Sequence, residues 1–186
     1  MSKWTIAKSF EFSYSHRVHS QILIPGLSID NVCSCRFRHG HNGVINIELE
    51  DTGLNEQGMI IDFKNLSFFK QFIDNTIDHK CILDINDPEV CSYFYPILEG
   101  MNAENRNEYL LQFAEDYWIV KPELYSKLEL FKQEIYQGLI FVNFIPTSEN
   151  LSKWFFDIIA NKLKNITNVT SVEFKETPKT SATYSI

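Results

Sequence analysis

Two stretches in which apolar and polar residues alternate, 4–12 and 43–50, most constrain the fold of this chain. Alternation with a period of two is typical of a strand that buries one face. Residues 13–38 between them show no clear period, and a turn rich in Gly, Asn and Asp follows at 51–58. The pattern predicts two antiparallel strands joined across a long loop.

Two other segments carry apolar residues at helical spacing. The first is a helix capped by Asp62, with a stripe at Leu66, Phe69, Ile73 and Ile77. The second begins after Pro146 with Thr147 or Ser148 as the cap, and it gives the strongest helical signal in the chain. Its stripe comprises Leu151, Trp154, Phe155, Ile158, Ile159 and Leu163. A late alternating segment at 169–175 predicts a further strand, so the expected fold class is α+β.

The segment at about 86–143 differs in character from the rest of the chain. It starts with Asn-Asp-Pro, and we expect one helix near 103–118 and another from Pro122. The apolar face of the latter would consist of Leu124, Leu128, Phe131 and Ile135. A short strand is expected at 139–144. We interpret the segment as a helical insertion in a single domain that spans 1–186.

Composition restricts the classes of partner. With 44% apolar and 22% charged residues the chain resembles an ordinary globular domain, and its net charge of −7 argues against nucleic-acid or anionic-membrane binding. No run approaches the roughly 18 apolar residues of a membrane span, and the first residues do not resemble a signal peptide. Four Cys are ordinary usage, so we expect a cytoplasmic protein with reduced thiols.

His39-Gly40-His41 is the first chemical signal. If the loop runs directly into the following strand, residues two apart point to one face, and the glycine crowds neither imidazole. His16, at the end of the first strand, is the candidate third ligand. Three imidazoles with one open position are the pattern of a catalytic zinc site. A lone histidine is more often a surface or hydrogen-bonded residue, so spacing alone leaves both interpretations open.

Other reactive residues are individually weak signals. Cys35 and Cys33 lie four and six residues before His39, and a metal or imidazole nearby lowers a thiol pKa. A small buried thiol is the plainer interpretation. Asp78-His79 follows the first helix, and Glu176 ends the last strand. Polar residues at the ends of helices and strands are more often solvent-exposed than catalytic.

Taken in order, these elements resemble the 6-pyruvoyl-tetrahydropterin synthase and 6-carboxy-tetrahydropterin synthase family. The matching pieces cover nearly the whole chain outside the insertion. They are FSYSH (12–16), CRFRHGHN (35–42), GMIIDF (58–63), IDH (77–79), PTSEN (146–150) and KETPKTSATY (175–184). The resemblance implies the T-fold, an antiparallel four-stranded sheet with two helices on one face. It also implies a homo-oligomer, a hexamer or tetramer, with active sites between subunits.

The resemblance assigns a role to each matched residue. His16, His39 and His41 would bind Zn²⁺, Cys35 would be the proton-abstracting thiolate, and Asp78 with His79 would form the partner acid–base pair. Residues Glu176, Thr147, Ser148 and Glu149 would hold the pterin. Arg17, Arg36, Arg38 and Lys80 are candidates to meet the triphosphate of the substrate.

Two reactions on 7,8-dihydroneopterin triphosphate occur in this family. One eliminates triphosphate to give 6-pyruvoyl-tetrahydropterin; the other also releases acetaldehyde and gives 6-carboxy-tetrahydropterin, on the route to queuosine. Carboxy-forming members tend to have the Cys four residues before HGH, and pyruvoyl-forming members six before. This chain has both, and Cys35 together with PTSEN favours the carboxy-forming reaction.

Two hypotheses from other classes remain. A zinc- or pterin-binding module without turnover would bind both ligands and form no product, and the joint presence of Cys35, Asp78 and His79 argues against it. A non-haem iron oxygenase would need a carboxylate as the third ligand and would depend on oxygen. One departure from the family pattern is Gly43, which follows HGHN where an aromatic residue is usual.

Overall fold

The computed structural model describes residues 2–29, 33–88, 90 and 95–186. The chain forms two compact units. The first comprises Met1–Ser13, His41–Asp78 and Thr147–Ile186, and the second comprises Tyr14–Gly40 and His79–Pro146. No helix in the described part of the chain is long and apolar enough to cross a membrane.

Four strands contribute to the first unit. They are β1 (Trp4–His16), β2 (His39–Asp51), β7 (Asn168–Thr177) and β8 (Thr180–Ser185). β2 pairs antiparallel with β7, with Val44 opposite Lys175, and β7 pairs antiparallel with β8. The two predicted alternating strands are therefore confirmed, but both are longer than expected. β1 runs on to His16 and β2 begins at His39, so the predicted loop is confined to the residues between them.

The two predicted helices also lie in the first unit. α1 (Ser67–Phe72) is preceded by a 3-10 turn at Phe63–Leu66 and continues as a π-helical turn at Ile73–Ile77, while α5 spans Ser148–Leu163. Both predicted caps are present. The Asp62 carboxylate accepts a hydrogen bond from the Lys64 N–H at 2.7 Å, and the Thr147 hydroxyl accepts one from the Asn150 N–H at 3.3 Å.

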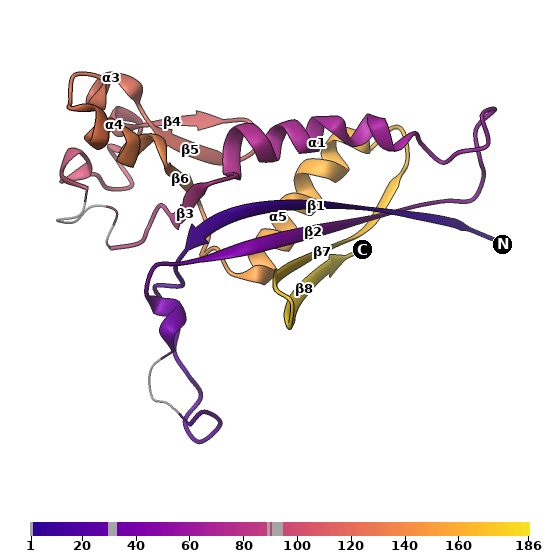
Figure 1. Cartoon of the computed structure of the whole chain (residues 1–186), viewed down its shortest axis with the longest axis horizontal. Helices are drawn as coiled ribbons and strands as arrows, with labels where there is room; N and C mark the ends of the chain where they lie inside the picture. Colours follow the sequence, from indigo (N-terminus) through magenta and orange to yellow (C-terminus); the bar gives the residue numbers. More distant parts are fainter. Residues whose placement is uncertain (1, 30–32, 89, 91–94) are drawn as a thin grey trace. The chain divides into compact units, whose positions relative to one another are not determined.

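The helices α1 and α5 lie beside the strands of the first unit (Figure 1), and aromatic side chains make the contacts between them. Phe10 of β1 lies edge-on to Phe69 of α1 with ring centroids 5.4 Å apart, and Phe12 lies edge-on to Phe155 of α5 at 6.0 Å. Phe12 also stacks on Phe174 of β7 at 5.9 Å. Because Phe10 and Phe12 are two residues apart on one strand, both helices cover the same face of the sheet.

The second unit has its own strands and core. Its strands are the end of β1 with β3 (Lys80–Asp84), β4 (Leu110–Phe113), β5 (Tyr117–Val120) and β6 (Leu139–Val142). β3 runs parallel to β1, with His16 opposite Ile82, and parallel to β6, whereas β4, β5 and β6 pair antiparallel. Three short helices complete the unit: α2 (Arg106–Tyr109), α3 (Pro122–Tyr125) and α4 (Leu130–Gln137).

The strand count corrects the sequence prediction. Hydrogen-bonded neighbours follow the order β4-β5-β6-β3-β1-β2-β7-β8, so the β-structure of the described residues is mixed and has eight strands, whereas four antiparallel strands were expected. The four antiparallel strands and two helices expected from the T-fold are found within the first unit. Of the additional strands, β6 matches the short strand expected at 139–144, whereas the others belong to residues that the sequence patterns left unassigned or assigned to helices.

The expected helical insertion is in large part wrong. Residues 103–118 contain only the single helical turn α2, followed by β4 and the start of β5, which meet at a turn where Asp116 has φ 57°. The helix expected from Pro122 is present as two short helices, α3 and α4, and three residues of its predicted apolar face, Leu124, Phe131 and Ile135, are exposed. Tyr125 and Tyr136 are buried instead and stack on each other in the core of the second unit.

The packing around Gly43 explains why glycine stands where the family usually has an aromatic residue. The rings of two core aromatic residues occupy the space beside it. A Cβ at this position would lie 2.7 Å from Cε2 of Phe174, which is fully buried, and 3.3 Å from Cε1 of Phe12. An aromatic side chain at position 43 would have no room in this packing.

We therefore expect Gly43→Ala to lower the free energy of unfolding by about 1–3 kcal/mol, as overpacking of a dense core does. Urea unfolding measures the change. Gly53→Ala is the matched control, since a Cβ there meets nothing within 4 Å, and its effect should stay within about 0.5 kcal/mol. Equal stability of the two variants would contradict the account of residue 43.

Candidate metal and thiol site

Three histidines meet where β1 ends and β2 begins. His16 is the last residue of β1, and His39 and His41 lie two apart at the start of β2, so their side chains share a face. One ligand nitrogen from each lies within 4.8 Å of the others. His16 is buried and the other two are half-buried. The sequence-predicted triad is thus brought together as a group that can hold a metal ion.

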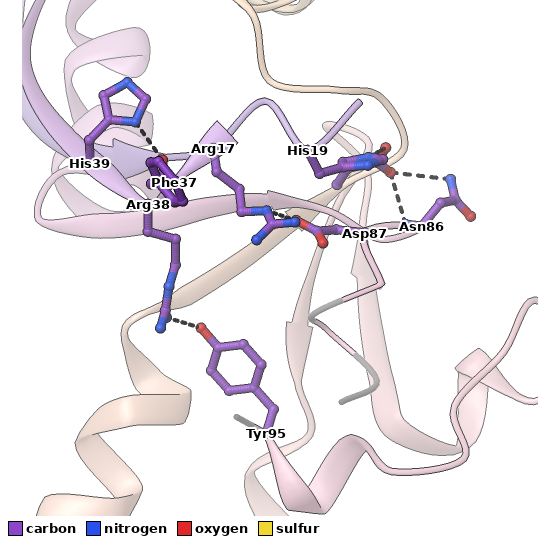
Figure 2. Close-up of polar contacts among 9 residues, drawn as sticks. Arg17, His19, Phe37, Arg38, His39, Asn86, Asp87 and Tyr95 are labelled. Carbon is purple, nitrogen blue, oxygen red and sulfur yellow. Dashed lines mark hydrogen bonds and ion pairs between the residues drawn. The ribbon is translucent and has the colours of Figure 1, made fainter. Parts of the chain in front are cut away.

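Backbone carbonyls fix two of these rings. His16 Nδ1 lies 2.6 Å from the carbonyl oxygen of Pro146. His39 Nδ1 lies 2.8 Å from the carbonyl oxygen of Phe37, as Figure 2 shows. A carbonyl only accepts, so each Nδ1 must carry the proton, and Nε2 is then the nitrogen with the lone pair. This arrangement is common among metal-binding histidines, because it sets the tautomer and the orientation of the ring.

Gly40 between the two histidines has a packing reason. A Cβ there would lie 3.3 Å from the backbone oxygen of Tyr14 in β1, closer than a side chain normally approaches. The glycine therefore allows the backbone of β1 to approach β2 closely beside the ligands.

Glu176, predicted to hold the pterin, lies beside the triad. Its Oε1 is 3.7 Å from Nε2 of His41, and both side chains are mostly buried. The distance exceeds that of a hydrogen bond, and the carboxylate would attract the ring by charge only if His41 were protonated. A ligand held by Glu176 would be within reach of the metal-binding group.

The two thiols occupy a 3-10 turn in the second unit. Cys33 precedes the turn Ser34–Arg36, which contains Cys35, and the Val18 N–H donates to the Cys35 carbonyl at 2.8 Å. Hydrogen bonds from the backbone and then the side chain of Cys35 lower the pKa of Cys33, with a smaller contribution from Gln21, although partial burial opposes them. The role of Cys35 as the thiolate stays a prediction, and the lowered pKa of Cys33 makes that neighbouring thiol a second candidate.

Asp78 and His79 follow an irregular helix end. The π-helical turn Ile73–Ile77 closes with the Asp78 N–H donating to the Ile73 carbonyl at 2.9 Å, and such turns are frequent at functional sites. Asp78 Oδ1 accepts from the Ser13 N–H at 2.9 Å. His79 has φ 60°, a left-handed conformation that is uncommon outside glycine. Their pairing as acid and base stays a prediction.

The other predicted ligand-binding residues differ in their surroundings. Thr147 uses its hydroxyl to cap α5, Ser148 is half-buried at the first turn, and Glu149 is exposed. Each predicted phosphate-binding cation contacts a protein group. Arg17 pairs with Asp87 at 2.8 Å, and Arg38 donates to the Tyr95 hydroxyl at 2.6 Å (Figure 2). Arg36 and Lys80 donate to the backbone carbonyls of Gln21 and Gln137.

A pocket in the second unit opens beside His39. Its volume is about 510 Å³, and its lining includes Arg38, Gly40, Cys81 and Tyr95. Sequence reasoning missed Tyr95 and also the carbonyls of Pro146 and Phe37. No sequence signal identifies a carbonyl acceptor, because every residue has one.

Comparison with known proteins gives a consistent result. The family model described as 6-pyruvoyl tetrahydropterin synthase matches residues 5–186. A relative from Aquifex aeolicus named 6-carboxy-5,6,7,8-tetrahydropterin synthase is 29% identical over 167 residues, which are 87% of this chain and 82% of the relative. A relative of the same name from Rickettsia conorii is 33% identical over 148 residues, 77% of this chain and 89% of the relative.

Solved structures agree in fold. An uncharacterized protein from Wolinella succinogenes is 36% identical with a TM-score of 0.91, and the match covers 100% of this chain and 99% of that one. The 6-pyruvoyl tetrahydropterin synthase of Caenorhabditis elegans is 21% identical with a TM-score of 0.56, covering 100% of this chain and 96% of that one. The latter similarity concerns the fold alone.

If the three histidines hold the metal, each single variant should bind zinc more weakly than the wild type. Replacing His16, His39 or His41 with Ala should weaken zinc binding by more than the about 10–100-fold that loss of an outer-shell partner costs. Competition with a chromogenic chelator measures the affinity. His79→Asn is the control, since Asn tolerates the left-handed backbone and should leave zinc binding unchanged. Loss of affinity in the control but not in the triad variants would refute the assignment.

The hydrogen bonds to Cys33 predict its reactivity. Because they lower its pKa, alkylation of Cys33 by iodoacetamide should rise at a lower pH in the folded protein than in urea. Peptide mapping by mass spectrometry measures each thiol separately. Cys35→Ala removes the side-chain donor and should move the midpoint upward. The same midpoint in folded and unfolded protein would show that the thiol is not stabilised as its thiolate.

Proposed function

The chain belongs to the 6-pyruvoyl tetrahydropterin synthase family, and from this premise we propose that it is a zinc-dependent 6-carboxy-5,6,7,8-tetrahydropterin synthase. It is an enzyme of the lyase class. The proposed reaction converts 7,8-dihydroneopterin triphosphate to 6-carboxy-tetrahydropterin, acetaldehyde and triphosphate, a step on the route to queuosine. The names of the Aquifex and Rickettsia relatives support the carboxy-forming reaction.

The observation that carries the proposal is the histidine triad with its fixed tautomers. His16 and His39 each have Nδ1 against a carbonyl, and the three ligand atoms lie within 4.8 Å of one another. Three neutral imidazoles suit Zn²⁺ with an open position for substrate, whereas the iron sites of oxygenases use a carboxylate as third ligand. Bound zinc would act as a Lewis acid on the side-chain hydroxyls of the substrate.

Glu176 supplies orientation in this proposal. Its carboxylate matches the guanidine-like edge of a pterin, to which it would make charge-assisted hydrogen bonds. Because Glu176 lies 3.7 Å from His41, a pterin anchored there would present its side chain to the triad. Ser148 and Glu149 at the start of α5 would complete the pterin pocket. Thr147 would contribute through its place in the loop, because its hydroxyl caps the helix.

Proton transfer would fall to the thiol turn and to Asp78-His79. A thiolate removes a proton next to the polarised hydroxyl, and the imidazole of His79 moves a proton in the opposite sense, oriented by Asp78. Asp78 is itself held to β1 through the Ser13 N–H. The left-handed backbone of His79 is consistent with a catalytic role, since such conformations cluster at active sites.

The pyruvoyl-forming reaction is the second candidate, and one observation favours it. The pKa of Cys33 is lowered, and Cys33 has the spacing of six that is associated with pyruvoyl-forming members. If Cys33 is the base, the chain would eliminate triphosphate from the same substrate and retain the side-chain carbons.

We also infer a cytoplasmic homo-oligomer. Cys33, Cys35 and Cys81 form no disulfide, as expected in a reducing compartment. Ile22, Ile24, Leu27 and Ile29 are 66–104% exposed on one loop, more apolar surface than a monomer usually leaves in contact with water. A second copy of the chain would cover it.

Product analysis tests both candidates. Zinc-loaded protein is incubated with 7,8-dihydroneopterin triphosphate, and products are identified by mass spectrometry for the wild type, Cys33→Ala, Cys35→Ala and the control Cys81→Ala. The carboxy-forming proposal expects 6-carboxy-tetrahydropterin and acetaldehyde, with Cys35→Ala inactive and Cys81→Ala normal. Loss of a general base typically reduces kcat by about 10²–10⁴-fold.

Other outcomes separate the alternatives. A dominant 6-pyruvoyl-tetrahydropterin product with Cys33→Ala inactive would establish the second candidate. Tight binding of zinc and pterin with no product would refute both reactions and leave a binding module.

A further inference from the structure

Two acidic side chains at the end of β3 hold the residues that follow His16. Asp87 Oδ2 lies 2.8 Å from Arg17 Nε, and Asp84 Oδ2 lies 3.0 Å from His19 Nε2 (Figure 2). The carboxylates are almost fully buried, with side chains 1% and 6% exposed, and their partners are 13% and 16% exposed. Neither pair is therefore a screened surface contact.

The acidic loop, residues 84–87, is itself internally braced. Asp84 Oδ1 accepts from the backbone N–H of Asn86 at 2.9 Å and from its side-chain amide at 3.2 Å, and the Asp87 N–H donates to the Asp84 carbonyl at 2.9 Å. The Ile85 N–H donates to Val142 of β6 at 2.9 Å. The loop thus presents two carboxylates from a position fixed by the sheet.

The segment that contains Arg17 and His19 also contacts residues 33–36, which we call the thiol turn. Val18, between Arg17 and His19, donates its N–H to the Cys35 carbonyl at 2.8 Å. Gln21 is tied back to Val18 at 3.2 Å, and its carbonyl accepts from Arg36 Nη1 at 2.6 Å. The side chain of Gln21 also hydrogen-bonds to Cys33. The hydrogen bonds to the Cys35 carbonyl and from Arg36 therefore both involve the short segment Val18–Gln21.

We propose that Asp84 and Asp87 are positioning residues for the thiol turn, acting through Arg17 and His19 on Val18 and Gln21. The inference rests on the proposed function in so far as it takes these thiols as proton-transfer groups. A buried ion pair stabilises a fold little better than apolar residues of the same volume, but it accepts a narrow range of geometries. In this protein the pair between Arg17 and Asp87 would fix the position of the neighbouring Val18, whose N–H in turn determines where Cys35 lies.

Asp87→Asn tests the proposal. It keeps the size of the side chain and removes the charge that holds Arg17. The expected result is an upward shift in the pH midpoint for alkylation of Cys33, because the turn loses the geometry that stabilises the thiolate. We also expect kcat to fall by roughly 10–100-fold with KM and zinc affinity little changed, as displacement of a reacting group does.

Two further variants and one internal control keep the test decisive. Asp116→Asn, the same change in the exposed turn between β4 and β5, should behave as wild type. Arg36→Ala removes the exposed link from the thiol turn to Gln21 without leaving a buried charge, so it decides the matter if Asp87→Asn fails to fold. Cys81 in β3 reports general loosening of the second unit, and its alkylation should not change.

The outcomes separate this inference from the proposed function. An upward shift at Cys33 with Cys81 unchanged supports positioning, even if the wild type forms no product from the pterin substrate. Unchanged Cys33 profiles in both Asp87→Asn and Arg36→Ala would overturn it. Equal acceleration of Cys33 and Cys81 would also overturn it, since the carboxylates would then serve stability alone.

Discussion

The hydrogen bond between His16 Nδ1 and the Pro146 carbonyl is the interaction on which the candidate site depends. His16 is 1% exposed, and a buried imidazole requires a partner for each polar atom or a costly loss of hydration. The carbonyl immediately precedes the cap of α5, so the loop that begins this helix also orients a candidate metal ligand. His39 repeats the arrangement with Phe37, which leaves the ring nitrogens on the opposite side available for a metal.

The thiol turn is positioned by the same physical means, through backbone groups fixed by buried polar contacts. Val18 has an apolar side chain and contributes to the site through its N–H, and its neighbours Arg17 and His19 each contact a buried carboxylate. A change in the segment at 84–87 can thereby reach Cys35 without any direct contact with it. The insertion, which begins at about residue 86, is thus connected to the candidate chemistry.

Local patterns predicted the first unit well and the second poorly. Phe10, Phe12 and Phe174 alternate in strands with one buried face, and α5 repeats its stripe over four turns, so short windows suffice. In the second unit, β6 was expected from its apolar run, but β3 was missed because its last three residues are all buried and give no alternation. Leu110, Tyr117 and Trp118 resemble a helical stripe in sequence, but pairing across the β4–β5 turn makes them strands.

Side-chain type and short-range period carry enough information to identify the two long strands, the two capped helices and the three candidate histidine ligands from the sequence. Folding is needed to bring His16 Nδ1 to the Pro146 carbonyl, to lower the pKa of the Cys33 thiol and to pair Arg17 with Asp87. These depend on backbone carbonyls and on partners as far apart as His16 and Pro146. Backbone groups are the same in every residue, so their roles arise only when folding brings particular ones together.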